Sequence, residues 1–139
     1  MKTQSIVLTV SMLFISILSL AQRTQKPDNL LFMLRQPEHI NQAIKTIDEL
    51  MSTKEKKLNV GHVEIIVCGE AVVNLTMKDA EMWIEQTSKY KNVSIVACGL
   101  SLEKFKKQRS DLVPGVQYTG NGFIRAFELQ KQGYLSVEL

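Results

Sequence analysis

The sequence has few of the residues that metal and nucleotide sites require. It contains two histidines and two cysteines in 139 residues. His39 and His62 are isolated and lack the close spacing to Cys68 or Cys98 that zinc sites show. No glycine-rich phosphate motif follows the first apolar segment, where a dinucleotide fingerprint would lie. We therefore expect neither a metal site nor a cofactor.

The net charge is also small. The chain has 17 basic and 14 acidic residues, a formal net charge of +3. Its basic residues cluster at 54–57 and 104–109, and such short runs are typical of solvated helix ends or loops. No nucleic-acid-binding motif accompanies them, so we expect no nucleic-acid partner.

Residues 1–21 have the composition of a signal peptide. Lys2 precedes an uncharged, largely apolar run from Ile6 to Leu20, and Ser19 and Ala21 are small residues of the kind that signal peptidase selects. The run approaches the roughly 18 residues of a spanning helix, so a membrane anchor is the alternative. The interspersed serines and the well-formed site favour cleavage after Ala21. We then expect an exported protein without a stable membrane anchor, in the periplasm of a Gram-negative bacterium.

The rest of the chain suffices for one domain with a single core. Residues 22–29 are polar and include Pro27, which indicates a flexible lead-in to a domain at 30–139. Short apolar runs bounded by turn residues predict strands at 30–34, 63–67, 93–98, 116–119 and 134–137. Helices are expected at 37–51, from Thr76 past Ile84, at about 101–108 and at about 123–132.

This alternation of strands and helices implies parallel β-α-β units. Because the strands are apolar on both sides, they need helices on both faces. We therefore expect an α/β fold, a three-layer α/β/α sandwich around a mostly parallel five-stranded sheet. Ligands and chemistry gather outside the carboxyl ends of such strands. Cys68, Cys98 and the loop at 120–122 all fall at those ends.

Cys98 is the candidate nucleophile, because the third predicted strand ends there and a helix is expected to begin near Ser101. The amides of a helix start favour a thiolate over a thiol. Gly99 would let a sulfur donor approach the backbone, and the amides of Leu100 and Ser101 could hold developing negative charge. Asn121 is a further candidate anion- or substrate-binding residue. In the alternative interpretations, Ser101 is an N-cap and Cys98 a buried small hydrophobe.

The two cysteines invite a disulfide in an oxidising compartment. If their strands are adjacent, about 4.8 Å apart, a bridge is feasible. With one strand between them, a separation of about 10 Å exceeds the roughly 7 Å limit for the Cα atoms of a disulfide. Strand order does not follow from this pattern, so both arrangements stay open.

Several segments resemble a known family, and they are Val63–Val72, Val93–Leu102, Pro114–Val116 and Glu128–Tyr134. Together they are similar to the DsrE/DsrF-like sulfur-relay family, from about Leu30 to the end of the chain. The most specific parts are the Ala-Cys-Gly segment that contains Cys98 and the Leu-Gln-x-x-Gly-Tyr ending.

The resemblance implies parallel strands between helices, homo- or hetero-oligomers and, in competent members, a cysteine that carries sulfur as a persulfide. The family's reactive cysteine corresponds to Cys98. Cys68 corresponds to no family cysteine, and it is interpreted as structural or as a resolving thiol. The best-known members act in the cytoplasm, whereas this chain has a predicted signal peptide. We therefore expect an exported, stand-alone member.

The resulting hypothesis is an exported, homo-oligomeric sulfur carrier or thiol-handling protein, at most a sulfur-transfer protein, with a persulfide on Cys98. Its sulfur donor and acceptor are unknown. The alternative is a non-catalytic oligomeric module with a structural Cys98, which binds a small ligand or a protein at the same strand ends. Glu70, Asn74, Tyr118 and Asn121 are candidates to line that surface, although all suit turns or solvated positions.

Overall fold

The computed structural model describes residues 26–53 and 58–139. The elements within these ranges are β1 (Asp28–Leu34), α2 (Glu38–Ser52), β2 (Val60–Val67), α3 (Ala71–Asn74), α4 (Ala80–Ser88), β3 (Val93–Cys98), α5 (Gly99–Lys104), the 3-10 turn η1 (Arg109–Asp111), β4 (Gln117–Thr119), α6 (Gly122–Lys131) and β5 (Leu135–Glu138). The predicted signal peptide at 1–21 lies outside the described residues. None of the helices in the described ranges has the length and apolar character to cross a membrane.

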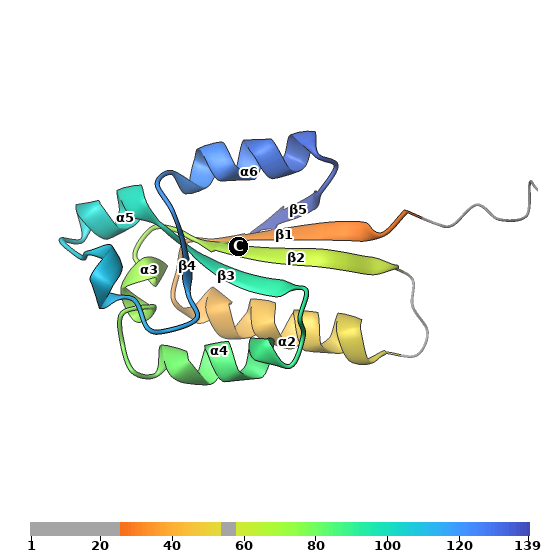
Figure 1. The fold of residues 1–139 in the computed structure, drawn as a ribbon, viewed down its shortest axis with the longest axis horizontal. Coiled ribbons are helices and arrows are strands. Elements are labelled where there is room, and N and C mark those ends of the chain that lie inside the picture. Colours follow the sequence, from red (N-terminus) through yellow and green to blue (C-terminus); the bar gives the residue numbers. More distant parts are fainter. Residues whose placement is uncertain (1–25, 54–57) are drawn as a thin grey trace, which may run out of the picture.

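The strands of the described chain form one five-stranded sheet with the order β4-β3-β2-β1-β5, and every neighbouring pair is parallel. Helices α2 and α4 cover one face and α6 covers the other (Figure 1). The steps from β1 to β4 run in one direction along the sheet, and the step from β4 to β5 returns. Because such crossovers are right-handed, the returning helix must lie on the opposite face. The predicted three-layer α/β/α sandwich is thus confirmed.

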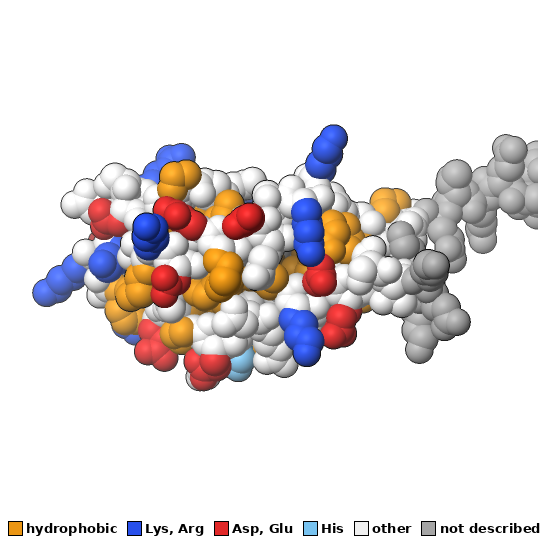
Figure 2. All heavy atoms as spheres, turned by 90° about the horizontal axis from the view of Figure 1, so that it is seen from below, with side chains coloured by type: hydrophobic (Ala, Val, Ile, Leu, Met, Phe, Trp, Pro, Cys, Tyr) orange, Lys and Arg blue, Asp and Glu red, His pale blue; other side chains and the backbone are white. Residues whose placement is uncertain are grey.

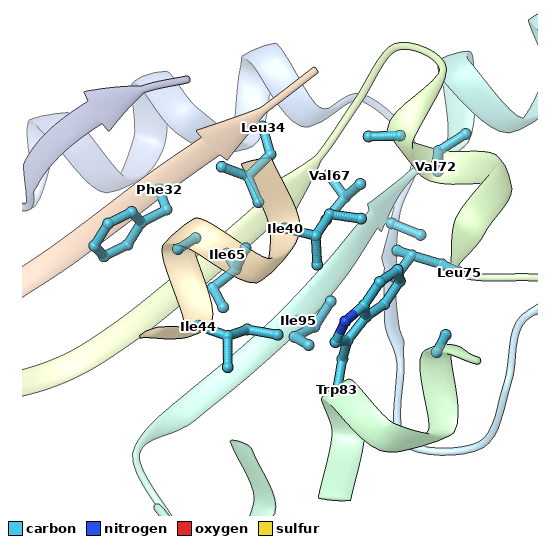
Figure 3. Close-up of a cluster of buried hydrophobic side chains, with 14 of the residues drawn as sticks. Phe32, Leu34, Ile40, Ile44, Ile65, Val67, Val72, Leu75, Trp83 and Ile95 are labelled. Carbon is cyan, nitrogen blue, oxygen red and sulfur yellow. The ribbon is translucent and has the colours of Figure 1, made fainter. Parts of the chain in front are cut away.

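Two apolar cores follow from the alternation of side chains along the central strands. The larger core lies between the sheet and the helices α2 and α4, and Trp83 of α4 points into it (Figure 3). The smaller core lies under α6 and consists of Leu31, Met33, Ile66, Cys68, Val96, Cys98, Ala126 and Leu129. Strand alternation therefore places both cysteines on the face that α6 covers.

Two local differences from the sequence-based prediction have clear causes. Strand β1 begins at Asp28, inside the predicted lead-in, because the Asp28 carboxylate accepts a hydrogen bond from the Asn59 amide (2.8 Å) and Asn29 Oδ1 accepts one from the His62 amide (2.8 Å). The helix expected from Thr76 begins only at Ala80. The Thr76 hydroxyl instead donates to the Val73 carbonyl (2.8 Å), which closes the turn after the short helix α3.

Candidate functional site

Cys68 and Cys98 lie side by side at the carboxyl ends of two adjacent strands. Val67 of β2 pairs in register with Ala97 of β3, and each cysteine is the next residue along its chain. Neither cysteine is in a disulfide. Of the two arrangements left open by the sequence, the structure has the one with adjacent strands, whose spacing of about 4.8 Å is compatible with a bridge.

The first residue of α6 lies directly against both cysteines. The Gly122 amide donates a hydrogen bond to Cys98 Sγ, with an N–S distance of 3.2 Å. A Cβ atom on Gly122 would lie 2.7 Å from Cys68 Sγ and 3.1 Å from Cys98 Cβ. This close packing requires glycine. Since helix N-termini carry partial positive charge, α6 presents a donor and a favourable dipole to the sulfur of Cys98.

Asn121 has a positioning role at this helix start. Its Oδ1 atom accepts hydrogen bonds from the amides of Phe123 (3.0 Å) and Ile124 (3.3 Å), so Asn121 is the N-cap of α6. With these two amides engaged, the Gly122 amide is the donor that α6 directs at Cys98. Asn121 therefore acts on the sulfur through the geometry of the helix.

The two thiols have opposite acidities. The pKa of Cys98 is lowered to about 5, chiefly by a hydrogen bond from the Cys68 thiol, with smaller contributions from the Gly122 amide and from Ser101, while burial opposes the shift. The pKa of Cys68 is raised above its usual range, because the thiol donates that hydrogen bond and is buried. The two thiols therefore titrate as a coupled pair, in which the ionised form is favoured on Cys98 and the protonated form on Cys68.

Ser101 joins the ends of β2 and β3 beneath this pair. Its hydroxyl oxygen accepts a hydrogen bond from the Gly69 amide (2.9 Å), and the residue is buried. The same hydroxyl interacts with the sulfur of Cys98 and lowers its pKa. Ser101 thus belongs to the thiol environment through its hydroxyl. It lies inside α5, whose N-cap is Cys98, so the alternative interpretation of Ser101 as an N-cap is wrong.

Gly99 and Leu100 lie beside the site, but the groups predicted to bind a donor are engaged within the protein. A Cβ atom on Gly99 would lie 2.5 Å from the Tyr118 hydroxyl and 2.8 Å from the Gly120 carbonyl oxygen. The space next to Gly99 is therefore filled. The Leu100 amide donates to the Gly120 carbonyl (3.0 Å). The segment between β4 and α6 thus covers the start of α5.

Both sulfurs are closed off from solvent in this conformation. The exposed fraction is 0% for Cys98 and 1% for Cys68. Gly122 packs on both, and the preceding Gly120 is exposed, with no atom within 4 Å of the position that its Cβ would take. Access to Cys98 from solvent therefore requires the surrounding structure to open, and Gly122 is part of the cover that contacts both cysteines.

A cleft of about 420 Å³ opens at the carboxyl ends of the strands, lined by Arg35, Gln36, Gly69, Glu70, Lys104, Phe105, Glu138 and Leu139. Gly69 directly follows Cys68, and the Arg35 charge acts on the Cys68 pKa by lowering it. The cleft therefore adjoins the thiol pair. Glu70 is the one residue of the predicted binding surface that lines it.

Another groove, of about 330 Å³, runs between α2 and α4 and includes Asp48, Lys89 and Tyr90. The Asp48 carboxylate accepts hydrogen bonds from Lys89 Nζ at 2.5 Å and from the Tyr90 hydroxyl at 2.6 Å. Figure 2 shows this face, on which basic, acidic and apolar side chains are interspersed. It is the face opposite the cysteines, so the groove is remote from the thiol pair.

The sequence-based prediction missed an ion pair that fixes α6 to the sheet. Arg125 donates to both carboxylate oxygens of Glu64, each at 2.8 Å, and the exposed fraction of Glu64 is 2%. Glu64 is an acidic residue within the apolar strand β2, and this was the available signal. Nearby, the Tyr134 hydroxyl and His62 Nδ1 are 3.1 Å apart. Within the described ranges, no group of three or more His, Cys, Asp or Glu side chains has a metal-binding arrangement.

No known protein-family profile matches this chain, and no curated protein matches it. Several solved structures match this chain. A protein of unknown function, MTH1491 from Methanobacterium thermoautotrophicum, has a TM-score of 0.68 at 16% identity, covering 82% of this chain and 100% of that chain. The conserved protein of unknown function BT1422 from Bacteroides thetaiotaomicron has a TM-score of 0.59 at 19% identity, covering 81% and 95%. The likeness is one of fold.

Proposed function

We propose that this chain is an exported DsrE/DsrF-like protein that accepts sulfane sulfur on Cys98. The observation that carries the proposal is a buried sulfur that receives a hydrogen bond from the Gly122 amide at the start of α6 and lies beside Cys68, which lowers its pKa. Both neighbours stabilise a thiolate, and the thiolate is the nucleophilic form of cysteine. The resemblance of the sequence around Cys98 to the sulfur-relay family supports the same chemistry.

The uptake step is a thiol–disulfide type of exchange with a small persulfide, R–S–SH. The Cys98 thiolate attacks the outer sulfur of the donor, the S–S bond of the donor breaks, and R–S⁻ leaves. Cys98 then carries the transferred sulfur as Cys98–S–SH. Because Cys98 is buried, the step requires the cover over the sulfur, which includes Gly122, to open.

The experiment uses Cys68→Ser, a variant whose only thiol is that of Cys98 and whose hydroxyl replaces the hydrogen-bond donor. After incubation with a small persulfide, intact mass and peptide mapping should show one added sulfur at Cys98. The matched control, Cys68→Ser with Cys98→Ser, should gain nothing. If Cys98 remains unmodified under conditions that load a cysteine peptide, the proposed uptake is wrong.

The proposal also includes a homo-oligomer, as the resemblance implies. Several apolar side chains of α6 are exposed, with exposed fractions of 41% for Phe123, 56% for Ile124 and 69% for Phe127. The neighbouring residues of edge strand β5 are exposed as well. Exposed apolar area of this kind favours association. A monomer mass from light scattering would contradict this part of the proposal.

A second candidate is a binding module in which Cys98 is structural. The observation in its favour is that both sulfurs are buried while an open cleft with Arg35, Glu70 and Lys104 lies at the adjoining strand ends. The same mass experiment separates the candidates. A carrier gains sulfur in Cys68→Ser, whereas a module with an inert Cys98 gains none, although circular dichroism shows that the variant is folded.

A further inference from the structure

We propose that Cys68 resolves the persulfide on Cys98, so that the two cysteines close as a disulfide and the transferred sulfur leaves as sulfide. The inference rests on the proposed function, because it requires sulfur uptake on Cys98. It adds the fate of that sulfur and gives Cys68 a chemical role. The protein would then reduce sulfane sulfur instead of storing it for a protein acceptor.

The first support is the geometry of the two strand ends. Because Val67 and Ala97 are register partners on adjacent parallel strands, Cys68 and Cys98 follow at equivalent positions. Strand spacing of about 4.8 Å falls within the Cα separation of about 4.4–6.8 Å that disulfides adopt. Both side chains point to the α6 face and belong to the same small core. The bridge therefore requires no change of strand register.

The second support is that both sulfurs lie against the same residue, Gly122. Its amide nitrogen is 3.2 Å from Cys98 Sγ, and the position that its Cβ would take is 2.7 Å from Cys68 Sγ. The residue packed over both is Gly122, which has no side chain to intervene. An external thiol must first displace this cover, whereas Cys68 is already in place. Intramolecular reaction of well-placed groups is favoured over the bimolecular alternative by several orders of magnitude.

The third support is the charge around the pair. During resolution, Cys68 must become a nucleophile and a sulfide anion must leave. The hydrogen bond with Cys98 and burial raise the pKa of Cys68, and the Arg35 charge opposes this shift only in part, so Cys68 must pass its proton to the leaving sulfur during the step. The Gly122 amide at the N-terminus of α6 favours an anion beside Cys98. The cleft lined by Arg35 and Gly69 adjoins Cys68, so the product has a short way to solvent once the cover over the sulfurs opens.

The step balances as Cys68–SH + Cys98–S–S⁻ → Cys68–S–S–Cys98 + HS⁻. A bond forms between the two Sγ atoms, and the bond between Cys98 Sγ and the terminal sulfur breaks. The proton of Cys68 leaves with that sulfur, which is reduced to sulfide, while the two cysteines are oxidised to a disulfide. Two molecules of a small thiol then reduce the disulfide by exchange, forming R–S–S–R and restoring both cysteines.

The test compares the wild-type chain with Cys68→Ser, Cys68→Ala and Cys98→Ser, each incubated anaerobically with a stoichiometric small persulfide and quenched in acid. The wild-type protein should release about one sulfide per chain and yield a Cys68–Cys98 disulfide in the peptide map. Both Cys68 variants should retain the added sulfur and release at least about tenfold less sulfide. Cys98→Ser should neither retain added sulfur nor release sulfide. A small thiol should convert the single turnover of the wild type into multiple turnovers.

The outcomes distinguish this inference from the proposed function. If the Cys68 variants load sulfur and the wild type retains it equally well, Cys68 is not the resolving thiol, although Cys98 remains a carrier. If none of the chains that contain Cys98 accepts sulfur, the proposed function itself is wrong. The alanine and serine variants together guard against a folding defect that is specific to one of them.

Discussion

The acidity of Cys98 depends first on its hydrogen bond from Cys68, and replacing that donor tests the electrostatics of the site. In Cys68→Ala, Cys98 loses the largest cause of its low pKa but keeps the Gly122 amide. A hydrogen bond to a charged group contributes about 1.5–3 kcal/mol. At about 1.4 kcal/mol per pKa unit, the pKa should rise by about 1–2 units. We therefore expect a change from about 5 to between about 6 and 7.

The lowered pKa of Cys98 also makes the free energy of unfolding depend on pH. The pKa of Cys98 is lower in the folded protein than in the unfolded chain, where it is about 8.5. The contribution of Cys98 to the free energy of unfolding is therefore complete above the pKa of the unfolded chain, and it is lost as the pH falls through the folded pKa of about 5. Between about pH 5 and pH 7, Cys98 should add about 2 kcal/mol to the free energy of unfolding of the wild type, and about 0.4–1.4 kcal/mol to that of Cys68→Ala.

The thiolate is measured by its ultraviolet absorbance during a pH titration in a phosphine reductant, because this signal does not require access to the buried sulfur. Urea unfolding at the two pH values gives the stability difference, and Cys98→Ser identifies the part that comes from Cys98. If wild type and Cys68→Ala both titrate near the ordinary thiol value, the assignment of a stabilised thiolate to Cys98 is wrong.

Three further predictions concern other parts of the chain. Arg125→Met leaves the buried Glu64 carboxylate unpaired and should cost about 3 kcal/mol in urea unfolding, with partial recovery when Glu64→Gln is added; a cost below about 1 kcal/mol would refute this. Gly122→Ala forces a Cβ against the core and should lower the free energy of unfolding by about 1–3 kcal/mol. Gly120→Ala, whose Cβ would face open space, is the control and should lower it clearly less. Mass spectrometry of the exported protein should find an N-terminus at Gln22, and an uncleaved chain would contradict export through this signal peptide.

Local pattern was sufficient for most of the fold. The apolar runs at 63–67 and 93–98 predict buried strands, and the observed strands β2 and β3 contain these two runs. The spacing of Ile40, Ile44 and Ile47 predicts a helix with one buried face, as α2 shows. The prediction was wrong where a side chain had two local options. Thr76 resembles a helix cap in sequence, but its hydroxyl bonds a preceding carbonyl.

The candidate site was only partly predictable. Cys98 is identifiable from its position at a strand end, and Ser101 from its place in the following turn. The Gly122 amide lies 24 residues beyond Cys98 and carries no such signal, because a backbone donor is the same in every residue. Glu64 is visible as an acidic residue in an apolar strand, but its partner Arg125 is 61 residues away.

The sequence by itself determined the alternation of strands and helices, the apolar faces and the placement of both cysteines at strand ends, since these depend on periodicities of a few residues. Only the tertiary structure decided that β2 and β3 are neighbours and that α6 crosses the face on which the cysteines lie. Strand order and helix placement depend on how distant segments pack and cross over, and short-range periodicity does not encode that choice. The contact of Cys68, Cys98 and Gly122 is a product of that packing.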